Sequence, residues 1–220
     1  MKQSIFFNGS NEIIAQRIKD YLRNHDDFLS AKTMKSPRAA GDAIQEIISE
    51  QFAELANEHC GSYSNDFARR SMADLAFSDI FGNYNIVDVK THRSDTKFNM
   101  PNLTSVERLS RFYEDDNNYF SLLMIKYHIE NTELIIENVT FQPIEFLSWE
   151  CLTIGALGWG QIQIANSNKV IINPKYSRRQ WMIELCDILL EFYPKEIIKI
   201  NARINKFETV KQYWINKTER

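Results

Sequence analysis

The sequence is poor in the residues that interrupt chains or link domains. It has only seven glycines and five prolines in 220 residues, and it shows no internal repeat, low-complexity tract or flexible linker. A chain of this length can bury a sizeable core within a single domain. We therefore expect one domain that spans residues 1–220.

Cysteine and long apolar runs are also scarce. The three cysteines, Cys60, Cys151 and Cys186, are far apart, odd in number and without the spacing of a zinc site. We interpret them as reduced thiols, which is typical of a cytoplasmic protein. No stretch approaches the apolar length that crosses a bilayer, and the first residues, MKQSIFFNGSNE, do not resemble a secretory signal. We expect no membrane partner.

No charge of one sign dominates the chain. The formal net charge is −3, which argues weakly against a nucleic-acid binder because phosphate contacts need Lys and Arg. Between Asn166 and Gln180, however, there is no acid and there are four basic residues, and residues 195–220 carry seven basic against three acidic residues. This distribution fits one basic cleft on a mildly acidic body. Scattered surface charge is the alternative, and composition alone favours it.

Four segments have the apolar period of a helix. Residues 11–22 and 41–59 repeat apolar side chains at helical spacing. Residues 103–113 form a shorter candidate, in which Thr104 and Glu107 have the spacing of a capping box. Ser177 and Gln180 have the same spacing at the start of residues 177–193, and a separate final helix is expected after Pro194.

The remaining apolar segments favour strands. Residues 72–92 read as two strands around a Gly82–Asn83 turn, and residues 118–129 and 132–141 read as a second hairpin. In GQIQIA, residues 160–165, polar and apolar residues alternate strictly, which predicts a further strand. The order of the elements predicts an α/β or α+β domain with a mixed central sheet flanked by helices.

Asp88 and Lys90 stand two residues apart within an apolar run of the expected hairpin, and Asp74 begins the preceding strand. Side chains two apart point to the same face, so pairing through the Gly82 turn would bring both carboxylates and the lysine together. Two adjacent carboxylates repel unless a cation lies between them, and oxygen ligands of this kind suit Mg²⁺. A lysine there could orient or deprotonate a water molecule that attacks a phosphodiester.

A simpler reading of the same residues stays open. Most D-x-K triplets in strands are ordinary salt bridges, and the upstream acid raises the specificity only to a moderate level. Asp79 is a rival to Asp74, but it lies close to the turn and we interpret it as a solvated turn residue.

The pattern Asp74, then Asp88-Val89-Lys90, resembles the PD-(D/E)xK nuclease core, although Ala73 stands where that motif often has proline. Four further segments resemble the blunt-cutting type II restriction endonucleases of the HpaI/HincII group, in the same order: AAGDAIQEIISEQF, MPNLTSVERLSRFY, LGWGQIQIAN and SRRQWMIELCDILLEFY. The resemblance covers roughly residues 36–208. It implies a restriction-endonuclease-like core and a homodimeric, prokaryotic enzyme that cuts double-stranded DNA at a six-base palindrome and leaves blunt ends.

The resemblance also implies roles for single residues. Asp74 and Asp88 would hold Mg²⁺, Lys90 would be the catalytic lysine, and Asn102 would touch base edges. Further DNA contacts are expected on three kinds of side chain: the strand amides, the hydroxyls before the short helix, and the cations, namely Gln161, Gln163, Thr104, Ser105, His92, Arg93, Lys97, Lys169, Lys175, Arg178 and Arg179.

One position departs from the family. A glutamate commonly stands where this chain has Gln45, and Glu46 follows it, so Glu46 or Glu50 is a candidate for an outer metal ligand, and a solvated helix face is the alternative for both. Two other functions use the same residues. A repair or nicking nuclease would share the core, and a non-catalytic DNA-binding module would share the fold without cutting.

Overall fold

The computed structural model describes residues 3–24, 36–63, 74–130 and 133–218. The chain divides into two compact units, Met1–Lys175 and Tyr176–Arg220. The single domain expected over residues 1–220 stays a prediction.

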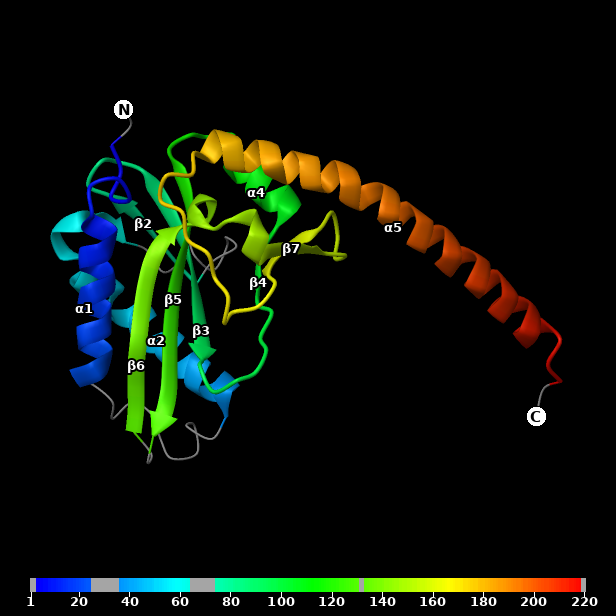
Figure 1. Ribbon diagram of the computed structural model, residues 1–220, viewed down its shortest axis with the longest axis horizontal. Helices are drawn as coiled ribbons and strands as arrows, with labels where there is room; N and C mark the ends of the chain where they lie inside the picture. The colour runs from blue at the N-terminus through cyan, green and yellow to red at the C-terminus, as the bar shows by residue number, and fades with distance from the viewer. Residues whose placement is uncertain (1–2, 25–35, 64–73, 131–132, 219–220) are drawn as a thin grey trace. The chain divides into compact units, whose positions relative to one another are not determined.

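A five-stranded mixed sheet forms the centre of the first unit (Figure 1). Its strands lie in the order β1 (Cys60–Tyr63), β2 (Leu75–Asp79), β3 (Tyr84–Arg93), β5 (Asn118–Glu130) and β6 (Glu133–Pro143). Only β3 and β5 are parallel, and the other neighbours are antiparallel. Both expected hairpins, β2–β3 and β5–β6, are confirmed, as is a mixed α/β architecture with a central sheet.

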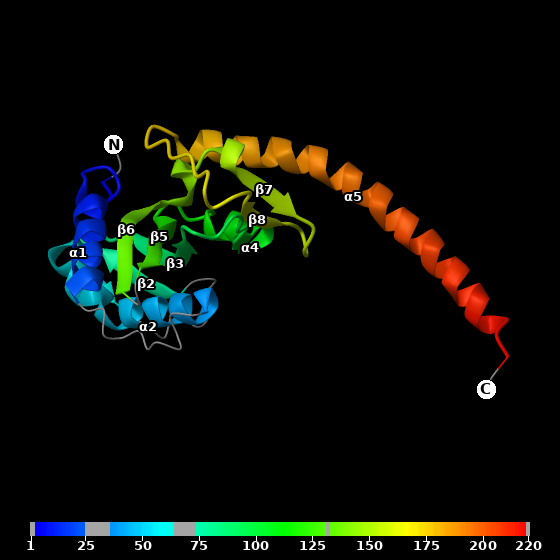
Figure 2. The same ribbon diagram turned by 60° about the horizontal axis from the view of Figure 1, so that its bottom comes forward.

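Helices α1 (Ser10–Asn24) and α2 (Pro37–Ala56) pack on this sheet, α1 against β6 and α2 against β3 (Figure 2). Each buries an apolar stripe, which includes Ile14 and Ile18 on α1 and Phe52 on α2. Phe52 lies at the centre, where its ring is 5.0–6.0 Å from three other aromatic rings. Val87 and Val89 of β3 belong to the same core, so Asp88 and Lys90 point to the opposite face of the sheet.

A smaller sheet of three strands was not expected in full. It has the order β4 (Asn102–Ser105), β8 (Gln161–Ile164) and β7 (Leu152–Gly155). Helix α4 (Val106–Phe112) follows β4 directly, and short 3₁₀ turns cover Asn57–His59, Ile144–Phe146 and Trp149–Cys151. The capping box expected at Thr104 and Glu107 is wrong, because the cap position falls on Ser105 and its side chain makes no capping bond.

The second unit consists mainly of α5 (Arg178–Ile215), which is drawn from orange to red in Figure 1. Its expected N-terminus is confirmed, since the Ser177 hydroxyl accepts a hydrogen bond from the Gln180 amide at 3.2 Å. The expected break at Pro194 is wrong. Proline removes one backbone hydrogen bond and crowds the preceding turn, but the residues on both sides keep helical geometry, and one helix of 38 residues results.

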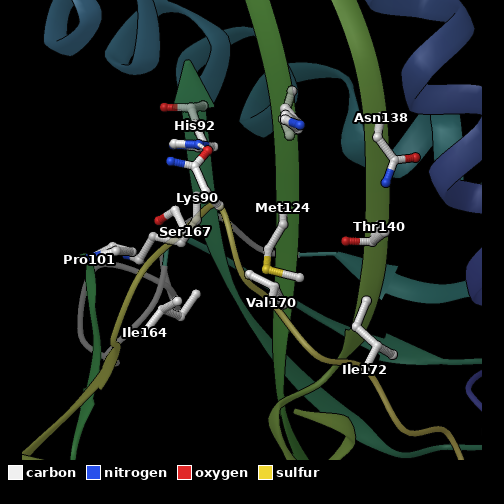
Figure 3. A pocket seen from close by; sticks show the side chains of 14 residues that line it. Lys90, His92, Pro101, Met124, Asn138, Thr140, Ile164, Ser167, Val170 and Ile172 are labelled. Atoms are coloured by element: carbon white, nitrogen blue, oxygen red, sulfur yellow. Dashed lines mark hydrogen bonds between the residues drawn. The ribbon is translucent and has the colours of Figure 1, made fainter. Parts of the chain in front are cut away.

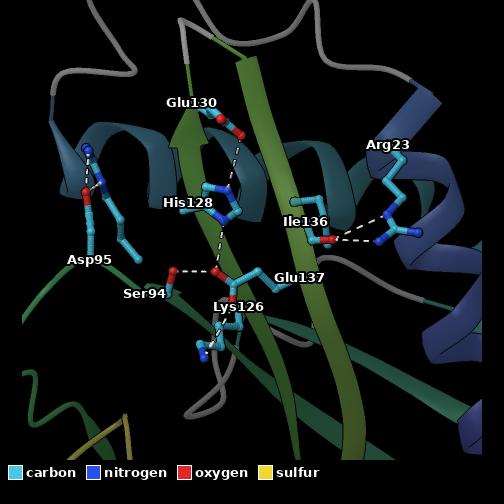
Figure 4. A network of polar contacts seen from close by, with 9 residues as sticks. Arg23, Ser94, Asp95, Lys126, His128, Glu130, Ile136 and Glu137 are labelled. Atoms are coloured by element: carbon cyan, nitrogen blue, oxygen red, sulfur yellow. Dashed lines mark hydrogen bonds and ion pairs between the residues drawn. The ribbon is translucent and has the colours of Figure 1, made fainter.

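A polar network connects β5, β6 and the end of β3 (Figure 4). Glu137 accepts hydrogen bonds from the hydroxyl of Ser94 and from His128 at 2.9 Å, and it pairs with Lys126 at 3.2 Å. These partners, the Ser94 hydroxyl above all, lower the pKa of Glu137 from 4.5 to about 2. A carboxyl whose pKa is lower in the folded state adds stability above its unfolded pKa, and that stability is lost as the pH falls.

We therefore expect Glu137→Gln to lower the free energy of unfolding at pH 7, and the difference from wild type to shrink as the pH falls from about 4.5 towards 2. Urea unfolding at pH 7 and at pH 2.5, near the folded-state pKa, measures this. Glu133→Gln, an exposed position on the same strand, is the matched control. An equal loss at both pH values would show that the carboxylate charge of Glu137 adds no stability.

Candidate functional site

The β2–β3 hairpin places Asp74 opposite Asp88. The two strands pair Leu75 with Val87, and the amide of Asp74 continues the ladder with a 3.0 Å hydrogen bond to the carbonyl of Val87. The chain reverses through Gly82, whose φ of +80° is a conformation that glycine adopts without strain. The local sequence thus brings the two acids to the same end of neighbouring strands.

Lys90 completes this cluster. Its Nζ donates to Oδ1 of Asp88 at 2.6 Å, and the amide of Val89 donates to Oδ2 of Asp74 at 2.7 Å. The Asp88 residue is only 5% exposed. Its second oxygen, Oδ2, is buried and has no hydrogen-bond partner among the described residues. A buried carboxylate oxygen without a donor is costly, so this atom faces a place where a further positive group would be stabilising.

The raised pKa values of Asp74 and Asp88 also indicate that a further positive charge would be stabilising here. Burial raises the pKa of Asp88 to about 7, against the opposing effect of the Lys90 ammonium, and the nearby Asp74 raises it further. Burial also raises the pKa of Asp74, although its hydrogen bond from Val89, the charge of Lys90 and a hydrogen bond with Gln45 oppose the shift. One ammonium group therefore does not compensate both carboxylates, and a divalent cation would.

Gln45 is a residue of this site that the sequence marked only as a departure. It lies on α2, and its side chain hydrogen-bonds the carboxyl of Asp74. Helix α2 comes close to β3 because residue 41 is glycine, where a Cβ atom would lie 2.5 Å from Oγ1 of Thr91. Glu46 is exposed on α2; its role as an outer metal ligand stays a prediction and gains no support from this position.

Asp79 is not the solvated turn residue that we expected. It is 2% exposed, and its carboxylate accepts hydrogen bonds from the amides of Phe81 and Asn83 and from the side chain of Asn83. These bonds close the β2–β3 turn. Asp79 thus holds the hairpin together at the end away from Lys90.

Lys90 also borders a cavity of about 220 Å³ on the sheet face away from α2 (Figure 3). Side chains of β3, β5 and β6 form its floor, among them Met124 and Thr140, and the segment with Ser167 and Val170 lies across it. His92 is buried here, and its Nε2 lies 2.8 Å from Oδ1 of Asn168. The role expected for His92 at the DNA backbone gains no support from a buried ring.

The small sheet brings together the amides that the sequence assigned to DNA. Asn102 and Gln163 are paired across β4 and β8, and Nε2 of Gln163 donates to Oδ1 of Asn102 at 2.5 Å. Ser105 is paired with Gln161 in the same ladder. The Asn102 side chain is exposed, whereas Thr104 is buried at 3% exposure. The expected contact of Thr104 with phosphate therefore has no support.

The basic residues divide between the two units. Lys97, Lys169 and Lys175 are exposed in the first unit, where Arg93 forms an ion pair with Asp95 at 2.8 Å. Arg178 and Arg179 begin α5 in the second unit. Their roles at DNA phosphates stay predictions.

Within the described ranges, no three His, Cys, Asp or Glu side chains are grouped to hold a metal ion, and none of the helices could span a membrane. The Asp74–Asp88 pair is a smaller set, of the size that Mg²⁺ uses together with water and substrate phosphate. No protein-family model matches the chain, and no curated protein matches its sequence.

Proposed function

We propose that this protein is a type II restriction endonuclease of the HpaI/HincII group, which hydrolyses double-stranded DNA at a short palindrome with Mg²⁺ as its cofactor. The observation that carries the proposal is the hairpin geometry. Asp74, directly before β2, hydrogen-bonds Val87 and Val89 on either side of Asp88 and lies near enough to raise its pKa. Lys90 lies 2.6 Å from Asp88. A salt bridge alone explains Lys90 and Asp88, but it gives no role to the second acid, Asp74, which is held beside them although its burial raises its pKa.

The donor set fits magnesium. Asp74 and Asp88 would hold the ion, because both offer carboxylate oxygens and Oδ2 of Asp88 is buried without a donor among the described residues. When bound, Mg²⁺ lowers the pKa of water and offsets negative charge on the phosphodiester. The elevated pKa of both carboxyls would fall on binding, since a cation stabilises their charged forms.

The chain itself would supply the remaining groups. The Lys90 side chain is about a quarter exposed, so its ammonium can reach both Asp88 and a bound phosphate. There it would orient the attacking water and stabilise the charge that develops on the phosphate oxygens. Gln45, through its bond with Asp74, would hold that carboxylate in place.

We assign recognition of the DNA base sequence to the small sheet of β4, β8 and β7. The amides of Asn102 and Gln163 can each donate and accept, as recognition of base edges requires, and their mutual hydrogen bond orients both. A two-fold homodimer would present two such sheets to a palindrome, and each subunit would cut one strand. The six-base site and the blunt ends follow from the resemblance.

The test is cleavage of plasmid and phage DNA by the purified protein. We expect discrete linear fragments with Mg²⁺, none with EDTA, and the same short palindrome at every sequenced end. Ends that are blunt at the centre of the site would support the HpaI/HincII group. Nicked circles without linear fragments would instead support a repair or nicking nuclease, and DNA binding without cutting would contradict both enzymatic functions.

A further inference from the structure

Helix α5 carries a continuous apolar stripe, which we call the α5 seam. Ten positions follow one another at alternating steps of three and four residues. The ninth is Lys211, and the other nine are the members of the seam: Ile183, Cys186, Leu190, Tyr193, Ile197, Ile200, Ile204, Phe207 and Trp214. The series runs through Pro194 without a change of register. None of its members is among the residues that α5 buries, which are Trp181, Leu185 and Glu196.

This spacing is that of a coiled coil. Steps of three and four average about 3.5 residues, which keeps one stripe of a helix against a partner helix over many turns. The seam extends over about 46 Å at 1.5 Å per residue. Its side chains are exposed in this chain, for example 73% at Leu190 and 69% at Phe207. An exposed apolar surface of this length marks an interface rather than a solvated helix face.

The seam is complementary to itself in the antiparallel sense. Ile183 and Trp214, Leu190 and Phe207, and Ile197 and Ile200 are all centred on the same point, between residues 198 and 199. A two-fold axis through that point would pair every member of the seam except Cys186 with another member on a second α5, and Cys186 would meet Lys211. The match includes both ends, so no part of the stripe would be left uncovered.

Charge selects the same direction. Residues 184–191 contain three acids and no base, whereas residues 195–211 contain five basic and two acidic residues. Antiparallel helices place the acidic part of one beside the basic part of the other, and parallel helices oppose like charges. In the antiparallel pair, Lys211 of one copy lies opposite Cys186 of the second copy, and the acid Asp187 of that second copy is adjacent. In a parallel pair, the two Lys211 ammonium groups would face each other within the apolar seam.

We propose that the α5 seam binds the α5 seam of a second copy of this chain, as an antiparallel two-helix coiled coil. The pair would form the homodimer on which the proposed function rests. The inference itself depends only on the sequence and exposure of α5, so it is tested without DNA. The two proposals fail separately. A dimer that does not cut DNA would contradict the nuclease proposal alone, and a monomer that cuts would contradict the seam and the homodimer but not the metal-dependent chemistry.

The first experiment measures the mass of the full chain by sedimentation or light scattering. We expect two 25.8-kDa chains in the wild type. Ile197→Glu puts a charge into the seam on both helices and should raise the dissociation constant about tenfold or more. Ile198→Glu is the matched control, since Ile198 is adjacent and 70% exposed but lies outside the seam; it should leave the dimer intact. A monomeric wild type, or equal effects of the two variants, would overturn the proposal.

The second experiment fixes the direction. Under oxidation, Lys211→Cys should yield a cross-linked dimer through Cys186 and position 211 of the other copy. The double variant Lys211→Cys, Cys186→Ser should not cross-link, because antiparallel pairing separates the two copies of position 211. Wild type should not cross-link through Cys186 either. Cross-linking of the double variant would show parallel helices and contradict the antiparallel seam.

Discussion

Lys90→Ala is expected to lower the rate of Mg²⁺-dependent DNA cleavage by about 10²–10⁴-fold, the range for loss of a group that positions or transfers a proton in the transition state. The lysine is the only cation hydrogen-bonded to either carboxylate among the described residues. Its removal would leave the attacking water without an orienting group. It would also leave the charge on the phosphate oxygens without its nearest protein cation.

The measurement is the rate of plasmid linearisation under single-turnover conditions, together with DNA binding in Ca²⁺. Lys126→Ala is the control, because Lys126 lies on the adjacent strand and borders the same cavity but pairs with Glu137; it should change the rate by less than about fivefold. Removal of Lys90 leaves Asp88 buried without its partner, so circular dichroism must show that the variant is folded. Undiminished cleavage by a folded Lys90→Ala protein would exclude the role of Lys90.

Asp88→Asn is expected to abolish cleavage and, without metal, to stabilise the protein at pH 8. The pKa of Asp88 is about 7 in the folded chain and 3.8 ordinarily. The folded state therefore holds the proton more tightly than the unfolded state, so stability falls as the pH rises from about 4 to 7. Asparagine keeps the size of the side chain and removes the buried charge. We expect the variant to lose this part of the pH dependence and the wild type to keep it.

Mg²⁺ should reverse which of the two proteins, wild type or Asp88→Asn, is the more stable. Mg²⁺ binds the folded state through Asp74 and Asp88 in our proposal, so it should raise the melting temperature of the wild type. The asparagine variant has one carboxylate fewer and should gain little. Thermal unfolding with EDTA and with Mg²⁺ measures both effects. A variant that responds to Mg²⁺ as the wild type does would show that Asp88 is no ligand, and a less stable variant at pH 8 would show that the charge of Asp88 is compensated in the fold.

In this proposal, the arrangement that lets Asp74 and Asp88 bind a cation lowers the stability of the metal-free chain. Carboxylates that bind a cation are held close together and away from bulk water, and both features destabilise the chain until the ion is present. Lys90 relieves this only in part, because one ammonium group faces two acids. A structural salt bridge would need only one of the two acids, and the burial that raises the pKa of Asp74 would then bring no benefit.

The hairpin with the acids and the lysine could be read from the sequence because all of its determinants are local. Alternation along residues 84–93 sets which side chains share a face, and the Gly82 turn sets the register. The helical periods of α1 and α2 and the cap at Ser177 are local in the same sense. Each of these signals lies within about twenty residues, and neighbouring residues alone decide it.

Tertiary structure decided the features that join distant segments. The hydrogen bond of Gln45 with Asp74 depends on how closely α2 approaches β3 at Gly41, and the pairing of Asn102 with Gln163 spans 61 residues. Thr104 has the sequence of a helix cap, but the pairing of β4 with β8 takes it into a strand and buries it. Side-chain patterns specify a period and a face. Which faces meet depends on packing, because the entropy cost of loop closure and the gain from burial depend on segments far apart in the sequence.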